Sequence, residues 1–224
     1  MTDVMLFAAG LGTRMRPLTD TLPKPLIPVG QTTLLDHALG LTQLPTINNR
    51  VVNIHYRADQ VRAHLKGKSV TLSDESDELL DTGGGLKNAL PLLQGDPIMG
   101  LNTDAIWVGP NPIPQLLSAW KPNMTCLLMV VPIERTVGHP GKGDFDVNES
   151  GNLSRGRNTV YTGLQLTRRD VVASVPDRVY SMNRVWDMAA KVGGLYGVAY
   201  PGTWCDVGHP GGIALAEAML EGRA

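Results

Sequence analysis

The chain has 224 residues, of which 42% are hydrophobic, so it can bury a sizeable core and is most simply one domain covering residues 1–224. Its 20 basic and 21 acidic residues leave a net charge of −1, which provides no broad positive field for sequence-independent binding of nucleic acid. The two cysteines, Cys126 and Cys205, lie too far apart to indicate a zinc site or a disulfide framework.

Residues 1–3 lead directly into an apolar strand without a basic segment, and no apolar run approaches the length needed to span a bilayer. We therefore expect a cytoplasmic protein with no membrane partner. Because no broad field of charge is present, we expect the partner to be a small molecule.

Strands and helices are predicted to alternate through the first half of the chain. The first strand is predicted at 3–9, and its continuous apolar run after Asp3 is typical of a strand covered on both faces. Thr33 is a candidate N-cap for a helix over 33–41. Further strands are predicted at 51–55, 69–73 and 97–101, and further helices at 58–65 and 86–93. This order predicts an α/β fold with a mostly parallel sheet flanked by helices, in which ligands bind at the carboxyl ends of the strands.

The second half has a different pattern. A helix is predicted at 111–120 and a strand at 124–131, followed by a polar, glycine-rich segment at 132–143. Short strands at 144–147 and 160–166 are typical of a small antiparallel lobe over an open sheet edge. The remaining predicted elements are helices at 170–175 and 182–191, a strand at 195–200, a turn at 204–208 and a closing helix at 212–220.

The loop after the first strand has the composition of a phosphate pocket. Gly10 and Gly12 are followed by Arg14 and Arg16, and Lys24 stands between two prolines. Glycines let the backbone approach an anion, exposed backbone N–H groups donate to it, and cations balance its charge.

Two other glycine motifs that follow a first strand do not fit. A dinucleotide-binding fingerprint requires a third glycine where Met15 stands, and a GxxxxGK[ST] loop requires Lys-Ser or Lys-Thr directly after its last glycine. The simplest alternative is an ordinary strand-to-turn connection with solvated arginines. The glycine pair, the arginine pair and the Pro-Lys-Pro segment within one short window argue against it.

These residues resemble the signature of the sugar-1-phosphate nucleotidyltransferases, AAGxGTRxxPLT followed by PKPL. Residues 8–19 and 23–26 match it nearly throughout. Residues 82–84 resemble the family loop that holds the base and sugar of the nucleotide. Residues 102–104 resemble its N-G-D metal turn, and residues 204–208 resemble its W-x-D-[VI]-G turn.

The resemblance implies a Rossmann-like, mostly parallel sheet with a small antiparallel lobe over the sugar site. It implies a nucleotide-binding half of about 1–110 and a sugar-binding half of about 111–224. The implied reaction is attack of a sugar 1-phosphate oxygen on the α-phosphate of a nucleoside triphosphate, which releases pyrophosphate. Such a reaction depends on positioning and charge neutralisation, so it requires no nucleophilic Ser, Cys or His.

The resemblance also implies roles for individual residues. Arg14 would bind the β- and γ-phosphates, with Arg16 as the weaker candidate, and Lys24 would bind the α-phosphate as the second catalytic residue. Asp104 and Asp206 would hold one Mg²⁺ ion together with phosphate oxygens and water. The expected nucleotide-binding residues are Ala9, Gly10, Leu11, Gly12, Thr13, Arg14, Lys24, Thr82, Gly83 and Asn102.

Within the family, the chain is similar to the short single-domain members that act on N-acetylmuramate 1-phosphate with UTP in the recycling of cell-wall peptidoglycan. Residues 81–85 are similar to their E-T-G-G-G, and residues 138–145 to their GHHGRGDF. The expected sugar-phosphate-binding residues are Lys142, Gly143, Asp144, Thr162 and Gly163. Two departures stand out, because Thr103 replaces the usual glycine of the metal turn and His209 replaces the usual threonine.

Two alternatives remain open at this point. One is a guanylyl- or cytidylyltransferase that acts on mannose or heptose 1-phosphate. The other is a nucleotide-sugar sensing module without turnover. The oligomeric state is also open.

Overall fold

The computed structural model describes residues 1–223. Its strands are β1 (Thr2–Phe7), β2 (Pro28–Val29), β3 (Thr32–Thr33), β4 (Ile47–Ile54), β5 (Thr71–Asp74), β6 (Ile98–Asn102), β7 (Ala105–Val108), β8 (Cys126–Pro132), β9 (Thr136–Val137), β10 (Phe145–Val147), β11 (Leu153–Arg155), β12 (Thr159–Thr167), β13 (Leu195–Ala199) and β14 (Thr203–Asp206). Its α-helices are α1 (Leu34–Leu41), α2 (Ala58–Leu65), α3 (Asp81–Ala89), α4 (Pro112–Ala119), α5 (Arg169–Ser174), α6 (Met182–Lys191) and α7 (Gly211–Leu220).

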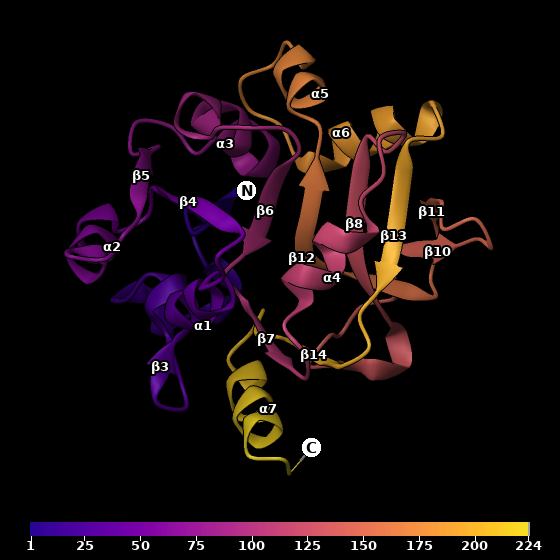
Figure 1. The fold of residues 1–224 in the computed structure, drawn as a ribbon. Helices are drawn as coiled ribbons and strands as arrows, with labels where there is room; N and C mark the ends of the chain where they lie inside the picture. The colour runs from indigo at the N-terminus through magenta and orange to yellow at the C-terminus, as the bar shows by residue number, and fades with distance from the viewer. Residues whose placement is uncertain (224) are drawn as a thin grey trace.

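One nine-stranded sheet runs through the molecule in the order β11-β10-β12-β6-β1-β4-β5, and β8 and β13 extend it beside β12 (Figure 1). Strands β6, β1, β4 and β5 are parallel neighbours, and β13 is parallel to β8. Strand β12 runs antiparallel to both β6 and β8. The predicted α/β class with a mostly parallel sheet is confirmed.

Helices cover both faces of this sheet. Successive residues of a strand point to opposite faces, so Val4 and Leu6 of β1 enter one core while Met5 enters the other. Helices α1, α2 and α4 pack on the first face, and α3, α5 and α6 pack on the second. Burial on both faces explains why β8 and the part of β1 after Asp3 are apolar throughout.

Two segments differ from their predictions. Residues 160–166 belong to β12, a long strand in the middle of the main sheet, because its side chains are buried between β6 and β8 rather than in a separate lobe. Residues 204–206 form strand β14 instead of a turn, because they pair with β7 and β9 and bury Trp204 and Cys205. The resulting small sheet, β7-β14-β9, packs against α7.

The helix boundaries largely follow the sequence. Thr33 caps α1 as predicted, and its hydroxyl accepts the N–H of Asp36 at 3.1 Å. Helix α3 begins at Asp81, five residues before the predicted start, because its glycines are themselves helical. Among residues 1–223, no helix combines the length and the apolar character that crossing a membrane would require.

Candidate active site

The glycine loop follows β1 and is held in one conformation. Gly12 has a φ of +64°, and a Cβ there would lie 2.8 Å from Thr19 Cγ2 and 3.0 Å from Lys24 Cβ, so a side chain does not fit. The hydroxyl of Thr19 donates to the Gly12 carbonyl at 2.8 Å. The N–H of Ala8 donates to Asn53 Oδ1 at 2.7 Å. The loop is therefore pre-organised before any ligand binds.

A cavity of about 410 Å³, the first cavity, opens at the carboxyl ends of β1, β4, β5 and β6. Its position agrees with the rule for ligand sites in open α/β sheets. Its lining residues are Phe7, Ala8, Ala9, Gly10, Lys24, Pro25, Asn53, Glu75, Leu79, Asp81, Thr82, Asn102, Thr103, Asp104 and Val179.

Lys24 and Asp104 form an ion pair at one end of the first cavity. The ammonium of Lys24 donates to Asp104 Oδ2 at 2.7 Å, and its side chain is 13% exposed. Asp104 lies between β6 and β7, while Asp206 ends β14 and pairs in register with Ala105. The antiparallel pairing of β7 with β14 thus brings together two carboxylates that are about a hundred residues apart in the chain.

Arg14 reaches the same place from the glycine loop. A Cβ on Gly208 would lie 2.9 Å from Asp206 Oδ1 and 3.2 Å from Arg14 Nη1. The side chains of Asp206 and Arg14 therefore both lie next to Gly208. Arg16 points elsewhere, because its guanidinium pairs with exposed Asp20 at 3.3 Å.

The two carboxylates have opposite pKa shifts. Burial raises the pKa of Asp104, but the nearby charges of Lys24 and Arg14 outweigh it and the net pKa is lowered. Burial and the negative charge of Asp104 raise the pKa of Asp206, and Lys24, Arg14 and His139 offset this only in part. Asp206 is therefore the carboxylate that would gain most from an additional cation.

This donor set fits a magnesium ion bound together with phosphate. Within residues 1–223, no cluster of three or more His, Cys, Asp or Glu side chains could hold a metal. Two carboxylates completed by phosphate oxygens and water are the usual ligands of Mg²⁺ at phosphate sites. Like charges that face one space also favour a divalent cation between them.

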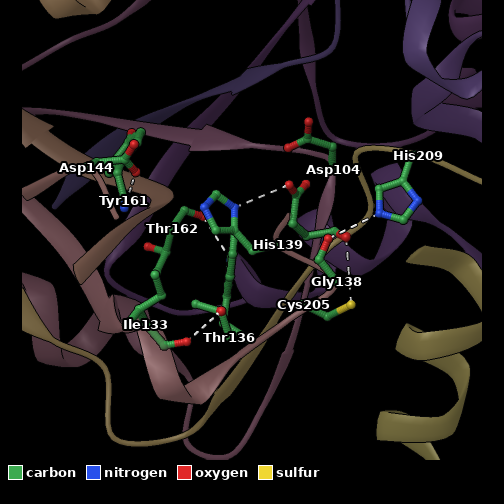
Figure 2. Close-up of polar contacts among 12 residues, drawn as sticks. Asp104, Ile133, Thr136, Gly138, His139, Asp144, Tyr161, Thr162, Cys205 and His209 are labelled. Atoms are coloured by element: carbon green, nitrogen blue, oxygen red, sulfur yellow. Dashed lines mark hydrogen bonds and ion pairs between the residues drawn. The ribbon is translucent and has the colours of Figure 1, made fainter. Parts of the chain in front are cut away.

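The two departures in the metal turns are accommodated. The hydroxyl of Thr103 donates to the Phe7 carbonyl at 2.8 Å, so its buried side chain joins the ends of β6 and β1. His209 Nε2 lies 3.3 Å from the carbonyl of Gly138 (Figure 2) and so supports the loop beside the carboxylates. His139, which is not among the predicted site residues, places its Nδ1 3.7 Å from Asp206 Oδ2.

The glycines of α3 allow residues 178–180 to pack closely against this helix. A Cβ on Gly83 would lie 2.3 Å from the Tyr180 ring, and a Cβ on Gly84 would lie 2.2 Å from the Arg178 carbonyl oxygen. Both glycine N–H groups donate to the Tyr180 carbonyl at 2.9 Å. Close packing at this point leaves Thr82, rather than Gly83, at the cavity wall.

A second cavity of about 310 Å³ adjoins the first. The two share Phe7, Asp81, Thr82 and Asn102. The other lining residues of the second cavity are Asp144, Phe145, Arg155, Tyr161, Gln165, Ser181, Met182, Asn183 and Trp186.

The predicted sugar-binding residues are placed differently from one another. Asp144 lines the second cavity, whereas Lys142 is exposed outside both cavities described above. A Cβ on Gly143 would lie 2.4 Å from the Arg157 carbonyl oxygen, so this glycine allows a close backbone approach. Thr162 is buried and donates to the Met129 carbonyl, and Gly163, with a φ of +89°, makes room for Asn102. Thr162 and Gly163 therefore line neither of these two cavities and present no polar group to them.

Among the predicted nucleotide-binding residues, the first cavity is lined by Ala9, Gly10, Lys24, Thr82 and Asn102. Leu11, Gly12, Thr13 and Arg14 lie in the adjacent loop. Three further lining residues, Asn53, Glu75 and Arg155, are not part of the predicted site. For Asn53 and Glu75 a signal was available, because they lie at the carboxyl ends of β4 and β5, where the ligand edge of the sheet was expected.

Comparison with known proteins adds independent findings. Residues 4–145 match the family described as MobA-like NTP transferase domain. The chain is 36% identical to an N-acetylmuramate alpha-1-phosphate uridylyltransferase from Caulobacter vibrioides, over 96% of each chain. It is 29% identical to a mannose-1-phosphate guanyltransferase from Yarrowia lipolytica, over 92% of this chain and 60% of that protein.

Solved structures show the same fold. A putative glucose-1-phosphate thymidylyltransferase from Bacillus anthracis superposes with a TM-score of 0.81 at 16% identity, covering 98% of this chain and 95% of that one. HddC from Yersinia pseudotuberculosis, complexed with GMP-PN, superposes with a TM-score of 0.80 at 19% identity, covering 98% and 100%.

Proposed function

We propose that this chain, which belongs to the family of MobA-like NTP transferases, joins a nucleoside triphosphate to a sugar 1-phosphate and releases pyrophosphate. The observation that carries the proposal is the pair of adjoining cavities, with Lys24 and Asp104 lining the first of them. The first cavity lies at the carboxyl ends of the parallel strands, where ligands bind in open α/β sheets, and we assign the nucleotide to it. The second cavity adjoins it and has polar lining residues that could bind the hydroxyl groups of a sugar.

UTP and N-acetylmuramate 1-phosphate are the proposed substrates. The relative from Caulobacter vibrioides, which matches over nearly the whole of both chains, carries that activity in its name, and so does a relative from Neisseria meningitidis at 27% identity. Similarity to mannose-1-phosphate guanyltransferases favours GTP with mannose 1-phosphate as the second candidate.

In the proposed reaction, an oxygen of the sugar 1-phosphate attacks the α-phosphorus of the nucleotide in line with the leaving group. A new P–O bond forms, the bond between the α-phosphorus and the bridging oxygen breaks, and its electron pair leaves with pyrophosphate. The ammonium of Lys24, which donates to Asp104 in the structure, would donate to the α-phosphate when the nucleotide is bound. There it would neutralise the negative charge of the transition state. Arg14 would bind the departing phosphates.

Asp104 and Asp206 would hold the proposed Mg²⁺ ion, which when bound neutralises phosphate charge and helps to align the reacting groups. Burial and, after it, the like charge of Asp104 raise the pKa of Asp206, and a cation between the two carboxylates would relieve both effects, which supports this assignment.

A matrix of nucleotides and sugar phosphates tests the proposal. UTP, GTP and CTP would each be combined with N-acetylmuramate, N-acetylglucosamine and mannose 1-phosphates in the presence of Mg²⁺, and pyrophosphate would be measured. We expect the highest kcat/KM for UTP with N-acetylmuramate 1-phosphate and loss of turnover in the Asp104→Asn, Asp206→Asn double variant. A preference for GTP with mannose 1-phosphate would support the second candidate. Nucleotide binding without pyrophosphate from any pair would contradict the proposal and favour a sensing module.

A further inference from the structure

The second cavity contains one basic side chain among its described lining residues, Arg155. The first cavity likewise contains one, Lys24. Arg155 lines only the second cavity, whereas the residues shared by the two cavities are neutral except for Asp81. The connected cavities therefore carry two separate cations, one on the nucleotide side and one on the sugar side.

The side chain of Arg155 is 48% exposed, and its backbone pairing and aromatic contacts orient it. Arg155 ends β11, in register with Phe145 of β10, and the turn that follows is held by Asp146 Oδ1, which accepts the N–H groups of residues 157 and 158. Its guanidinium lies 4.9 Å from the centre of the Phe145 ring and 5.9 Å from that of the Trp186 ring. Stacking on aromatic rings orients the planar guanidinium and limits its freedom.

Most of the donors of this guanidinium remain available. Across the described residues, its one hydrogen bond to another side chain is Nη2 to Asp187 Oδ1, at 2.8 Å. A guanidinium has five N–H donors in a planar fork that matches a carboxylate. Arg155 can thus bind a second carboxylate without giving up the first.

We propose that Arg155 recognises a carboxylate on the sugar 1-phosphate, remote from the phosphate, and so selects acidic sugars over their neutral counterparts. This inference rests on the proposed function, because it requires the phosphate to lie near Lys24 and the sugar ring to extend into the second cavity. N-acetylmuramate has such a group, since it is N-acetylglucosamine with a lactate carboxylate joined through an ether. Asp81 and Asp144 add negative charge to the cavity, so a third carboxylate needs a cation beside it.

The test compares N-acetylmuramate 1-phosphate with N-acetylglucosamine 1-phosphate, which differ only in the lactate group. In Arg155→Gln we expect kcat/KM for the acidic sugar to fall about 10- to 100-fold, the range of a lost charged hydrogen bond. The neutral sugar should change less than about threefold, since it makes no such bond. The loss should fall on KM, because the carboxylate is bound equally in the ground and transition states. Arg155→Lys should lose an intermediate amount, because it keeps the charge but not the planar fork.

Arg184→Gln is the matched control. Arg184 lies on α6, is paired with exposed Asp177 and lines neither cavity, so its loss should leave the preference between the two sugars unchanged. Equal losses for both sugars in Arg155→Gln, or no loss for either, would overturn the role of Arg155. Calorimetric binding of each sugar phosphate to the wild type and to Arg155→Gln decides the same question without turnover. If no nucleotide and sugar pair yields pyrophosphate, the proposed function fails, while the binding difference still tests Arg155.

Discussion

Glu75 connects the wall of the first cavity to the glycine loop, and its replacement separates two of its roles. Its side chain is buried, and Oε1 accepts Asn53 Nδ2 at 2.8 Å. Asn53 in turn accepts the N–H of Ala8 at 2.7 Å. In Glu75→Ala the buried amide of Asn53 loses its acceptor, at a cost of about 1–3 kcal/mol of unfolding free energy. For a chain of this size this lowers Tm by roughly 2–12 °C.

Glu75→Gln keeps an acceptor for Asn53 and removes the charge. Burial raises the pKa of Glu75 above its ordinary value of 4.5, and hydrogen bonds from Asn53 and the Leu80 N–H offset this only in part. The folded state therefore holds its proton more tightly than the unfolded state. That contribution to stability is fully present below the unfolded pKa and is lost as the pH rises through the folded pKa.

Urea unfolding of the wild type and both variants at pH values from 4 to 8 measures these effects. Relative to the wild type, Glu75→Gln should gain stability as the pH rises above about 4.5, whereas Glu75→Ala should stay less stable than Glu75→Gln at pH 7. We also expect Glu75→Ala to raise the KM for UTP, because the glycine loop loses its support. A difference between the wild type and Glu75→Gln that is constant across this pH range would refute the reasoning about the buried carboxyl. Equal stability of the two variants at pH 7 would refute the role of Asn53.

Three further predictions concern two helical glycines and the reaction centre. Gly84→Ala should lower the free energy of unfolding by about 1–3 kcal/mol, because its Cβ would meet a backbone carbonyl oxygen at 2.2 Å. Gly40→Ala, with open space around its Cβ in α1, should raise the free energy of unfolding by up to about 1 kcal/mol. Thermal unfolding of the two variants compares these effects. Lys24→Met should lower kcat about 10²- to 10³-fold, while Arg16→Met, which removes only an exposed ion pair, should stay within about twofold; an equal loss in both would contradict the roles assigned here. Asp104→Asn should weaken binding of Mn²⁺, used as a probe for Mg²⁺ and measured by its paramagnetic effect on water relaxation, at least about tenfold, and unchanged binding would remove Asp104 from the metal site.

The sequence predicted those parts of the fold and site that depend on local patterns. The apolar runs of β1 and β8, the Thr33 cap and the alternation of strand and helix gave the layers correctly. The parallel strands then placed Asp104 and the glycine loop at one edge, as expected.

Features that depend on long-range pairing were less accessible. Strand β12 pairs with β6 and β8, which are distant from it in the sequence. Without knowledge of these partners, the short strand predicted at 160–166 is assigned to a peripheral lobe. The role of the α3 glycines depends on the approach of residues 178–180, which no local pattern reveals. Arg155 stands out only after Phe145 and Trp186 are seen beneath its guanidinium.

The central claim is that the sugar phosphate attacks the α-phosphate of the nucleotide. It is tested most directly by incubating the protein and Mg²⁺ with N-acetylmuramate 1-phosphate and UTP labelled with ³²P at either the α- or the γ-position. We predict that the α-label appears in the nucleoside diphosphate sugar and the γ-label in pyrophosphate, and that both products require the sugar phosphate. Release of γ-label as orthophosphate, or of α-label as UMP without the sugar phosphate, would contradict this account.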